Sequence, residues 1–201
     1  MKTQNIIIAA ILLGTIVTQS CTKEYDRIEG TGSIVTQTLN LRDFNGIAAA
    51  GADNVVISYG PEQKVEVTGH SNIISRIRTD VSNGIWYMEL ENGNYGRYEL
   101  TYYITLPTIE KISYEGSGNI QVDGPMHVDY LELVLMGSCS FKGFTLNANY
   151  CQVDIVGSGN CEISAEKSLD VSIEGSGSVY YKGSPSIKNH ITGSGSVINS
   201  N

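Results

Sequence analysis

Residues suited to metal binding are scarce in this sequence. Only three histidines and four cysteines occur among the 201 residues. The histidines are His70, His127 and His190, and none of them has a partner at the spacing of an H-x-x-x-H motif. The cysteines form no C-x-x-C pair. The sequence therefore predicts no metal site and no cofactor.

The motifs of common catalytic sites are missing as well. No serine stands in a G-x-S-x-G turn, which excludes a nucleophile elbow of the hydrolase type. No glycine-rich segment continues to G-x-G-x-x-G before a helical pattern, which excludes the usual dinucleotide fingerprint. We therefore predict no catalytic residue.

Basic residues are outnumbered by acidic ones. Lysine and arginine total 13 against 21 aspartate and glutamate residues, and the formal net charge is −8. Such a chain repels polyanions, so a nucleic acid is excluded as a partner. The acidic residues are scattered rather than clustered, which is typical of a solvated surface.

Long apolar runs are also absent, because the longest covers only residues 6–17. Such a run is too short to span a membrane but suits an export signal, particularly after the basic residue Lys2. The segment Thr18-Gln19-Ser20-Cys21 that follows resembles a bacterial lipobox. This resemblance implies cleavage before Cys21 and lipidation, with palmitate among the acyl chains, and thus a lipoprotein anchored to the outer membrane and exposed at the cell surface. An ordinary secreted protein is the alternative.

Glycine, in contrast, is abundant, and in the C-terminal half it recurs in one phrase. The phrase GSG or a close variant begins at positions 116, 137, 157, 175 and 193, so the intervals are 21, 20, 18 and 18 residues. A short period of this kind indicates a stack of coils, each of which buries its apolar face against its neighbours. The repeat glycines are Gly116, Gly118, Gly157, Gly159, Gly175, Gly177, Gly193 and Gly195, and Cys139 replaces the second glycine of one repeat.

Apolar residues alternate with polar ones on both sides of each GSG. The inward columns contain Ile112, Leu133, Val153 and Val171, then Tyr114, Leu135, Ile155, Ile173 and Ile191, and after the turn Ile120, Phe141, Cys161, Val179 and Val197. Alternation with a period of two is the strand pattern. We expect an all-β, two-sheet β-solenoid (β-helix) with two turns in each coil. Because glycine adopts positive φ without steric cost, the GSG segments are predicted to be tight turns in which glycines such as Gly177 have positive φ.

A looser version of the pattern extends through residues 44–104. Gly51 and Gly69 are 18 residues apart, which predicts degenerate coils of the same solenoid. Residues 73–77 are expected to form a short helical or irregular turn, and Asn83-Gly84 a hairpin turn. We therefore divide the chain into a signal peptide (1–20), a flexible tether (21–34) and a single β-solenoid domain (35–201).

An ordered series of motifs carries a resemblance to a known family. It consists of Phe44-x-x-Ile47, Gly51, Val55-x-Ile57, Val65-x-Val67, Asn83-Gly84, Ile104-Thr105-Leu106-Pro107 and GSGNI. Over residues 35–195 the chain resembles the auto-transporter adhesin head domain, or GIN domain, of Bacteroidetes lipoproteins. The resemblance implies a β-helix that lacks the catalytic residues of pectin lyases and acyltransferases. It transfers no functional residue.

The remaining cysteines are predicted to belong to the core. Cys151 falls in the column of Leu131 and Leu169, and Cys161 falls in the column of Val179. The two cysteines are expected on opposite sheets, which pack roughly 10 Å apart, so we predict no disulfide bond.

Aromatic residues gather in the irregular segment before the repeats. Candidate ligand contacts are Trp86, Tyr95, Arg97, Tyr98 and Tyr102, because aromatic rings offer flat surfaces to sugars or protein partners. The alternative is that these rings fill the core or cap the solenoid.

We therefore expect a non-enzymatic lipoprotein with a surface that binds a glycan or a cell-surface protein. The alternative is a carbohydrate-active β-helix enzyme, a lyase or hydrolase, whose carboxylates would converge on one face; Asp154, Asp170 and Glu174 are at outward positions. In the last coil, Asn189 replaces a core residue, which predicts a hydrated end. End-to-end oligomerisation is the alternative.

Overall fold

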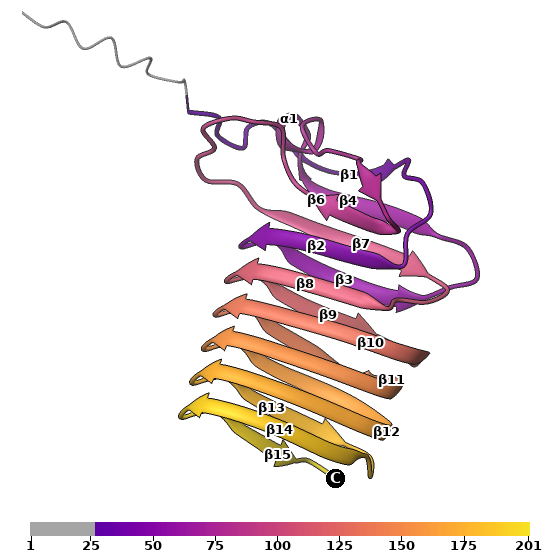
Figure 1. Ribbon diagram of the computed structural model, residues 1–201. Coiled ribbons are helices and arrows are strands. Elements are labelled where there is room, and N and C mark those ends of the chain that lie inside the picture. The colour runs from indigo at the N-terminus through magenta and orange to yellow at the C-terminus, as the bar shows by residue number, and fades with distance from the viewer. Residues whose placement is uncertain (1–26) are drawn as a thin grey trace, which may run out of the picture.

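The computed structural model describes residues 27–201, so the predicted signal peptide and Cys21 lie outside the described residues. Its strands form a ladder of stacked coils (Figure 1). The elements are β1 (Ile34–Leu39), β2 (Gly46–Gly51), β3 (Asn54–Tyr59), β4 (Lys64–His70), α1 (Ser71–Ile74), β5 (Val81–Ser82), β6 (Ile85–Met88), β7 (Leu100–Leu106), β8 (Lys111–Gly116), β9 (Asn119–Asp123), β10 (Met126–Gly137), β11 (Ser140–Gly157), β12 (Asn160–Gly175), β13 (Ser178–Lys182), β14 (Ser186–Gly193) and β15 (Ser196–Asn199).

The strands of one face run in parallel toward a common edge. On this face β2, β8, β10, β11, β12 and β14 pair in succession (Figure 1). The paired positions at the edge are Gly51, Gly116, Gly137, Gly157, Gly175 and Gly193. After each turn the chain continues on the second face, where β3, β9, the first residues of β11 and β12, β13 and β15 are stacked. The predicted two-sheet β-solenoid, with its GSG turns in line, is confirmed.

The two glycines of a GSG turn are required for different reasons. The first has a positive φ, which ranges from 100° at Gly137, in the turn that contains Cys139, to 132° at Gly175. The second does not have a positive φ. At Gly177 a Cβ atom would instead lie 2.3 Å from the carbonyl oxygen of Gly159 in the preceding coil. The prediction of positive φ at Gly177 is therefore wrong, because close stacking of the turns excludes a side chain there.

The inward columns form one continuous hydrophobic core. The columns around Leu133 and Leu135 are buried from β8 to β12, as the alternation predicted. Cys151 pairs with Leu131 and Leu169, and Cys161 pairs with Phe141 and Val179, so both thiols occupy core columns. Cys139, Cys151 and Cys161 are free and buried.

The change in coil length arises at the corner opposite the GSG edge. Between the pairs Gly143↔Ile163 and Asn147↔Ser164, β11 contains three residues that have no partner in β12. Between the pairs Ala148↔Ala165 and Tyr150↔Ser168, in contrast, β11 has one residue where β12 has two. The bulged corner therefore adds a net two residues to the 20-residue coil relative to the 18-residue coils.

The first two coils are stacked in an order that differs from the chain order. β2 and β3 form one coil, and β6 and β7 form another that packs on it in parallel. β8 and β9 then pair with the opposite edges of β2 and β3. The chain thus places the coil made of β2 and β3 between two coils that follow it in sequence.

The N-terminal cap departs from the solenoid pattern. β4 pairs antiparallel with β7, and β1 pairs antiparallel with β4. Gly69 lies within β4, where a Cβ atom would meet Leu100 at 2.5 Å, so its spacing from Gly51 is not a coil period and that prediction is wrong. The short helix α1 and the hairpin turn at Asn83 (φ 52°) and Gly84 (φ 75°) are confirmed. No helix in the part of the chain that the structure describes could span a membrane.

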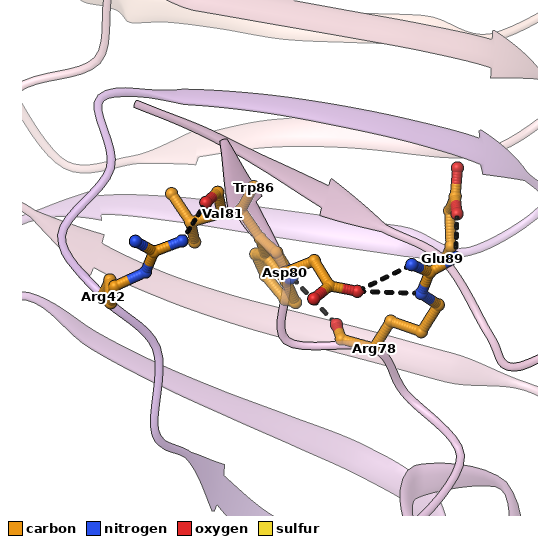
Figure 2. Close-up of polar contacts among 6 residues, drawn as sticks. All are labelled: Arg42, Arg78, Asp80, Val81, Trp86 and Glu89. Atoms are coloured by element: carbon orange, nitrogen blue, oxygen red, sulfur yellow. Dashed lines mark hydrogen bonds and ion pairs between the residues drawn. The ribbon is translucent and has the colours of Figure 1, made fainter. Parts of the chain in front are cut away.

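Trp86 anchors the hairpin to the core. Its indole Nε1 donates a hydrogen bond of 3.1 Å to the carbonyl oxygen of Arg78 (Figure 2). The Arg78 guanidinium forms ion pairs with Asp80 at 2.8 Å and with Glu89 at 3.3 Å. These contacts order the strand that leads into the segment 89–99.

Candidate ligand-binding site

The site lies where the first coil replaces a GSG turn with a long loop. β6 and β7 lie on opposite faces of the solenoid, as β2 and β3 do in the next coil. The connection between β2 and β3 is the short turn Gly51-Ala52-Asp53, whereas residues 89–99 connect β6 to β7. The loop 89–99 therefore occupies the GSG edge above Gly51, and it contains three of the five candidate ligand contacts.

The candidate contacts divide into a buried and an accessible group. Trp86 is 0% exposed and Tyr102 is 1% exposed. Trp86 packs against Phe44 and against Tyr102, with both ring centroids at 5.7 Å. For Trp86 the structure therefore contradicts a ligand contact, because its ring is fully enclosed in the core.

Tyr95, Arg97 and Tyr98 lie in the loop and border two cavities. The first, here named the loop cavity, has a volume of about 430 Å³ and is lined by residues 52–54 and 96–100. The second, here named the tyrosine cavity, has a volume of about 300 Å³ and is lined by the three tyrosines Tyr95, Tyr98 and Tyr102, together with Asp53 and residues 88–93. Asp53 and Tyr98 line both cavities. Tyr102 thus reaches a cavity although nearly all of its side chain is buried.

Asp53 was not predicted from the sequence, yet it lies at the centre of the site. It stands two residues after Gly51, in the position that Gly118 and Cys139 occupy in later coils. In those coils the position faces the interior, because Gly118 is buried and the Cys139 thiol lies 3.6 Å from the carbonyl oxygen of Tyr114. An alignment of the segment Gly51-Ala52-Asp53 with the repeats would have revealed a carboxylate in a column of small residues.

The Asp53 carboxylate has no partner in residues 27–201, neither a hydrogen bond nor an ion pair. Burial raises the pKa of Asp53 from 3.8 to about 6, because desolvation disfavours the charged form. Burial, and secondly the charge of Asp53, raises the pKa of Tyr98 and that of Tyr102. All three groups therefore share one poorly solvated region.

Arg97 supplies the positive charge at the mouth of the loop cavity. Its backbone N–H donates a hydrogen bond of 2.6 Å to Glu29 Oε2, which fixes the backbone of the loop. Its guanidinium has no hydrogen bond or ion pair to any residue in the described range. A third hollow of about 360 Å³ lies beside it, lined by Arg97, Tyr98, His70 and Glu29 among others.

The N-terminal segment is attached to this loop. The N–H of Ile28 donates a hydrogen bond of 2.7 Å to the carbonyl oxygen of Asn94, and Ile28 accepts one of 2.9 Å from Gly96. Gly30 donates to the carbonyl oxygen of Arg97 at 3.1 Å. These backbone hydrogen bonds attach the described part of the predicted flexible tether to the loop from Ile28 onward.

Catalytic groups do not converge at the site. Within residues 27–201, no group of three His, Cys, Asp or Glu side chains could hold a metal ion. His127 and His190 are exposed on distant coils, and the Nδ1 atom of His70 is 3.1 Å from the carbonyl oxygen of Gly32. The cysteine thiols lie in the core, where burial raises the pKa of Cys151 to about 12.

Comparison with solved structures identifies the same fold in other bacterial proteins. A putative adhesin from Bacteroides fragilis has 20% sequence identity and a TM-score of 0.57, with 86% of this chain and 99% of that chain covered. A putative adhesin from Parabacteroides merdae has 15% identity and a TM-score of 0.50, with 88% and 100% covered. None of the curated protein sequences matches this chain at a significant level.

A family model gives the assignment. The model described as "Putative auto-transporter adhesin, head GIN domain" matches residues 43–143 and 127–185. These matches span β2 to β13, including the turn that carries Asp53. Because they cover more than half of the chain, the protein belongs to the auto-transporter adhesin head GIN domain family.

Proposed function

We propose that this protein is a non-enzymatic binding protein of the cell envelope, of the adhesin type, whose ligand is a glycan held at the loop 89–99. The observation that carries the proposal is the pair of cavities that share Asp53 and Tyr98 in their lining, where a long loop replaces a GSG turn. Membership of an adhesin family supports an envelope location and a binding role.

The chemistry of the cavities suits a sugar. Tyr95 and Tyr98 are half-buried, and their rings meet edge to face with centroids 5.9 Å apart. The Tyr98 hydroxyl, the Asp53 carboxylate and the Arg97 guanidinium have hydrogen-bonding capacity that no described residue uses. Sugar recognition combines an aromatic surface with such donors and acceptors around a concave site.

The alternative, a carbohydrate-active β-helix enzyme, finds less support. Glycoside hydrolysis needs two carboxylates that flank one bond at a fixed separation. Asp154 and Asp170 are on the outer face of β11 and β12, where the former accepts a hydrogen bond from Gln152 and the latter pairs with Lys188. The loop cavity is lined by two carboxylates, Asp53 and Glu99, so a degradation assay is needed to tell a binding site from a hydrolytic one.

An anchor at Cys21 would hold the site near the bilayer. Cys21 precedes Arg27 by six residues, which span at most about 20 Å when fully extended. Since Ile28, one residue further on, and Gly30 are bonded to the loop 89–99, a lipidated Cys21 would keep this end of the domain within roughly 25 Å of the outer membrane. The ligand would then be a component of the same envelope or one drawn close to it, and the later coils would project outward.

A glycan array combined with a degradation assay tests the proposal. The purified protein is expected to bind a subset of envelope glycans, and Tyr98→Ala is expected to reduce that binding at least tenfold. Tyr59→Ala serves as the matched control, because Tyr59 is exposed on β3 away from the loop. Bound glycans should be recovered intact. Shortened products would establish the enzyme instead, and loss of binding in both variants would refute the assigned site.

A further inference from the structure

The tyrosine cavity is lined by acidic residues alone among its charged groups, whereas the loop cavity also contains Arg97. The lining of the tyrosine cavity includes the carboxyl side chains of Asp53, Glu89 and Glu91, and none of its lining residues is basic. The two glutamates are neutralised from outside, because Glu89 pairs with Arg78 at 3.3 Å and Glu91 pairs with Arg76 at 3.8 Å. Asp53 is thus the carboxylate of this cavity that lacks a countercharge among the described residues.

A carboxylate in this position is costly to the fold. Asp53 is half-buried, and the partial removal of a charge from water without a protein hydrogen bond or counterion is unfavourable. The later coils avoid the cost, since the same position holds glycine at 118, 159, 177 and 195 and a neutral thiol at Cys139. The replacement of this small residue by aspartate therefore indicates a role that packing does not explain.

The rings around Asp53 complete a site for a cation. Tyr95, Tyr98 and Tyr102 line the cavity, and Tyr98 and Tyr102 share the poorly solvated region of the carboxylate. Aromatic rings attract organic cations through their negative faces, most strongly where water is excluded. A carboxylate among tyrosines therefore combines a full charge with several weaker attractions for one ammonium group.

We propose that the tyrosine cavity binds the ammonium group of a ligand, with Asp53 as its counterion and Tyr95, Tyr98 and Tyr102 as its walls. The inference rests on the proposed function, because it names the chemical class of the group that the same loop recognises. Two sources carry this chemistry at a cell envelope: an amino sugar in a glycan and an ethanolamine headgroup in a lipid.

Titration of the purified full-length protein with paired small probes tests the proposal. D-glucosamine is compared with N-acetyl-D-glucosamine, in which the amine is neutral, and phosphoethanolamine is compared with phosphoglycerol. Calorimetry or NMR is expected to show that at least one amine binds at least tenfold more tightly than its partner without a charged amine. Preference for glucosamine identifies the glycan source, and preference for phosphoethanolamine identifies the lipid source.

Two variants make the result specific. Asp53→Asn is expected to abolish the preference for the amine, whereas Asp123→Asn, at an exposed position on β9, should retain it. Equal affinity for both members of each pair, or an unchanged preference in Asp53→Asn, overturns the inference. The proposed function is tested separately on the glycan array. If Asp53→Asn still binds glycans, glycan binding is supported although the ammonium inference is not. If the wild-type protein binds no glycan, the proposed function is contradicted.

Discussion

The hydroxyl of Tyr114 donates a 2.7 Å hydrogen bond to the backbone carbonyl oxygen of Asp53, and this bond joins the coil of β8 and β9 to the neighbouring coil of β2 and β3. The Tyr114 ring is completely buried in the column between β2 and β10. A Cβ atom at Gly118 would lie 2.0 Å from this hydroxyl, so the glycine makes room for the bond. The turn that presents Asp53 to the cavities is therefore held in place from within the core.

The protonation of Asp53 should be visible in the pH dependence of stability. Since its pKa rises from 3.8 to about 6 on folding, the folded protein retains this proton more tightly than the unfolded chain does. The free energy of unfolding should consequently fall as the pH rises from about 4 to about 6, by up to about 3 kcal/mol. Asp53→Asn should lack this component and be more stable than the wild type at pH 7.

Urea denaturation at several pH values measures this effect. The difference in stability between Asp53→Asn and the wild type should grow between pH 4 and pH 6 and remain constant above pH 7. Two parallel stability profiles would show that the Asp53 carboxylate is well solvated.

Close stacking leaves no room for a side chain at Gly177, although Cys139 occupies the equivalent position in another turn. Gly177→Ala should destabilise the protein by about 2–4 kcal/mol, because its Cβ would lie 2.3 Å from the backbone oxygen of Gly159 and 2.8 Å from Ile155. The neighbouring Ser176 is exposed, so Ser176→Ala should change stability by less than about 0.5 kcal/mol. Thermal denaturation of the two variants provides the comparison, and equal losses would mean that the turns can separate at little cost.

The sequence predicted the coils well because the alternating pattern and the glycines report local geometry. Apolar columns such as that of Leu133 define which side of a strand faces the core, and the GSG period defines where the coils align. The stacking order of the first coils was not predictable. The apolar alternation in β2 shows which side of the strand faces the core, but it does not show that β2 lies between β6 and β8. The alternation at Val65 and Val67 indicated a strand, but the antiparallel pairing of β4 was not predicted because Gly69 repeats the 18-residue spacing by coincidence.

The binding site was only partly predictable for a related reason. The loop 89–99 is rich in aromatic residues, and Tyr95, Arg97 and Tyr98 do border the cavities. Composition alone could not separate Trp86, which the fold encloses, from the tyrosines that it leaves accessible. Asp53 is far from the loop in sequence, and only the stacking of the turns brings it there.

The last coil offers a test of solenoid capping. Among residues 27–201, β14 pairs only with β12, and its inward residues Ile187 and Ile191 remain 39% and 36% exposed beside the polar Asn189. We expect the protein to be monomeric, and we expect Asn189→Val to increase self-association because it completes an apolar column at an open edge. Sedimentation velocity over a range of concentrations detects the change. Identical sedimentation of both proteins would contradict protection by polarity.

Lipidation at Cys21 predicts how the protein is held in the envelope. Cys21→Ala should abolish incorporation of labelled palmitate and release the protein from the membrane fraction. Cys139→Ala is the matched control, because this thiol is buried in the core and should have no effect on labelling. If the Cys21→Ala variant stayed in the membrane fraction, the prediction of a lipid anchor at Cys21 would be contradicted.

The most direct test of the binding site is the structure of the protein with a glycan selected from the array. The ligand is expected to contact Tyr98 and to enter the cavities that meet at Asp53, with its glycosidic bonds intact. The proposed function would be contradicted by a ligand seated on the outer strands of the later coils, with the loop 89–99 left unoccupied.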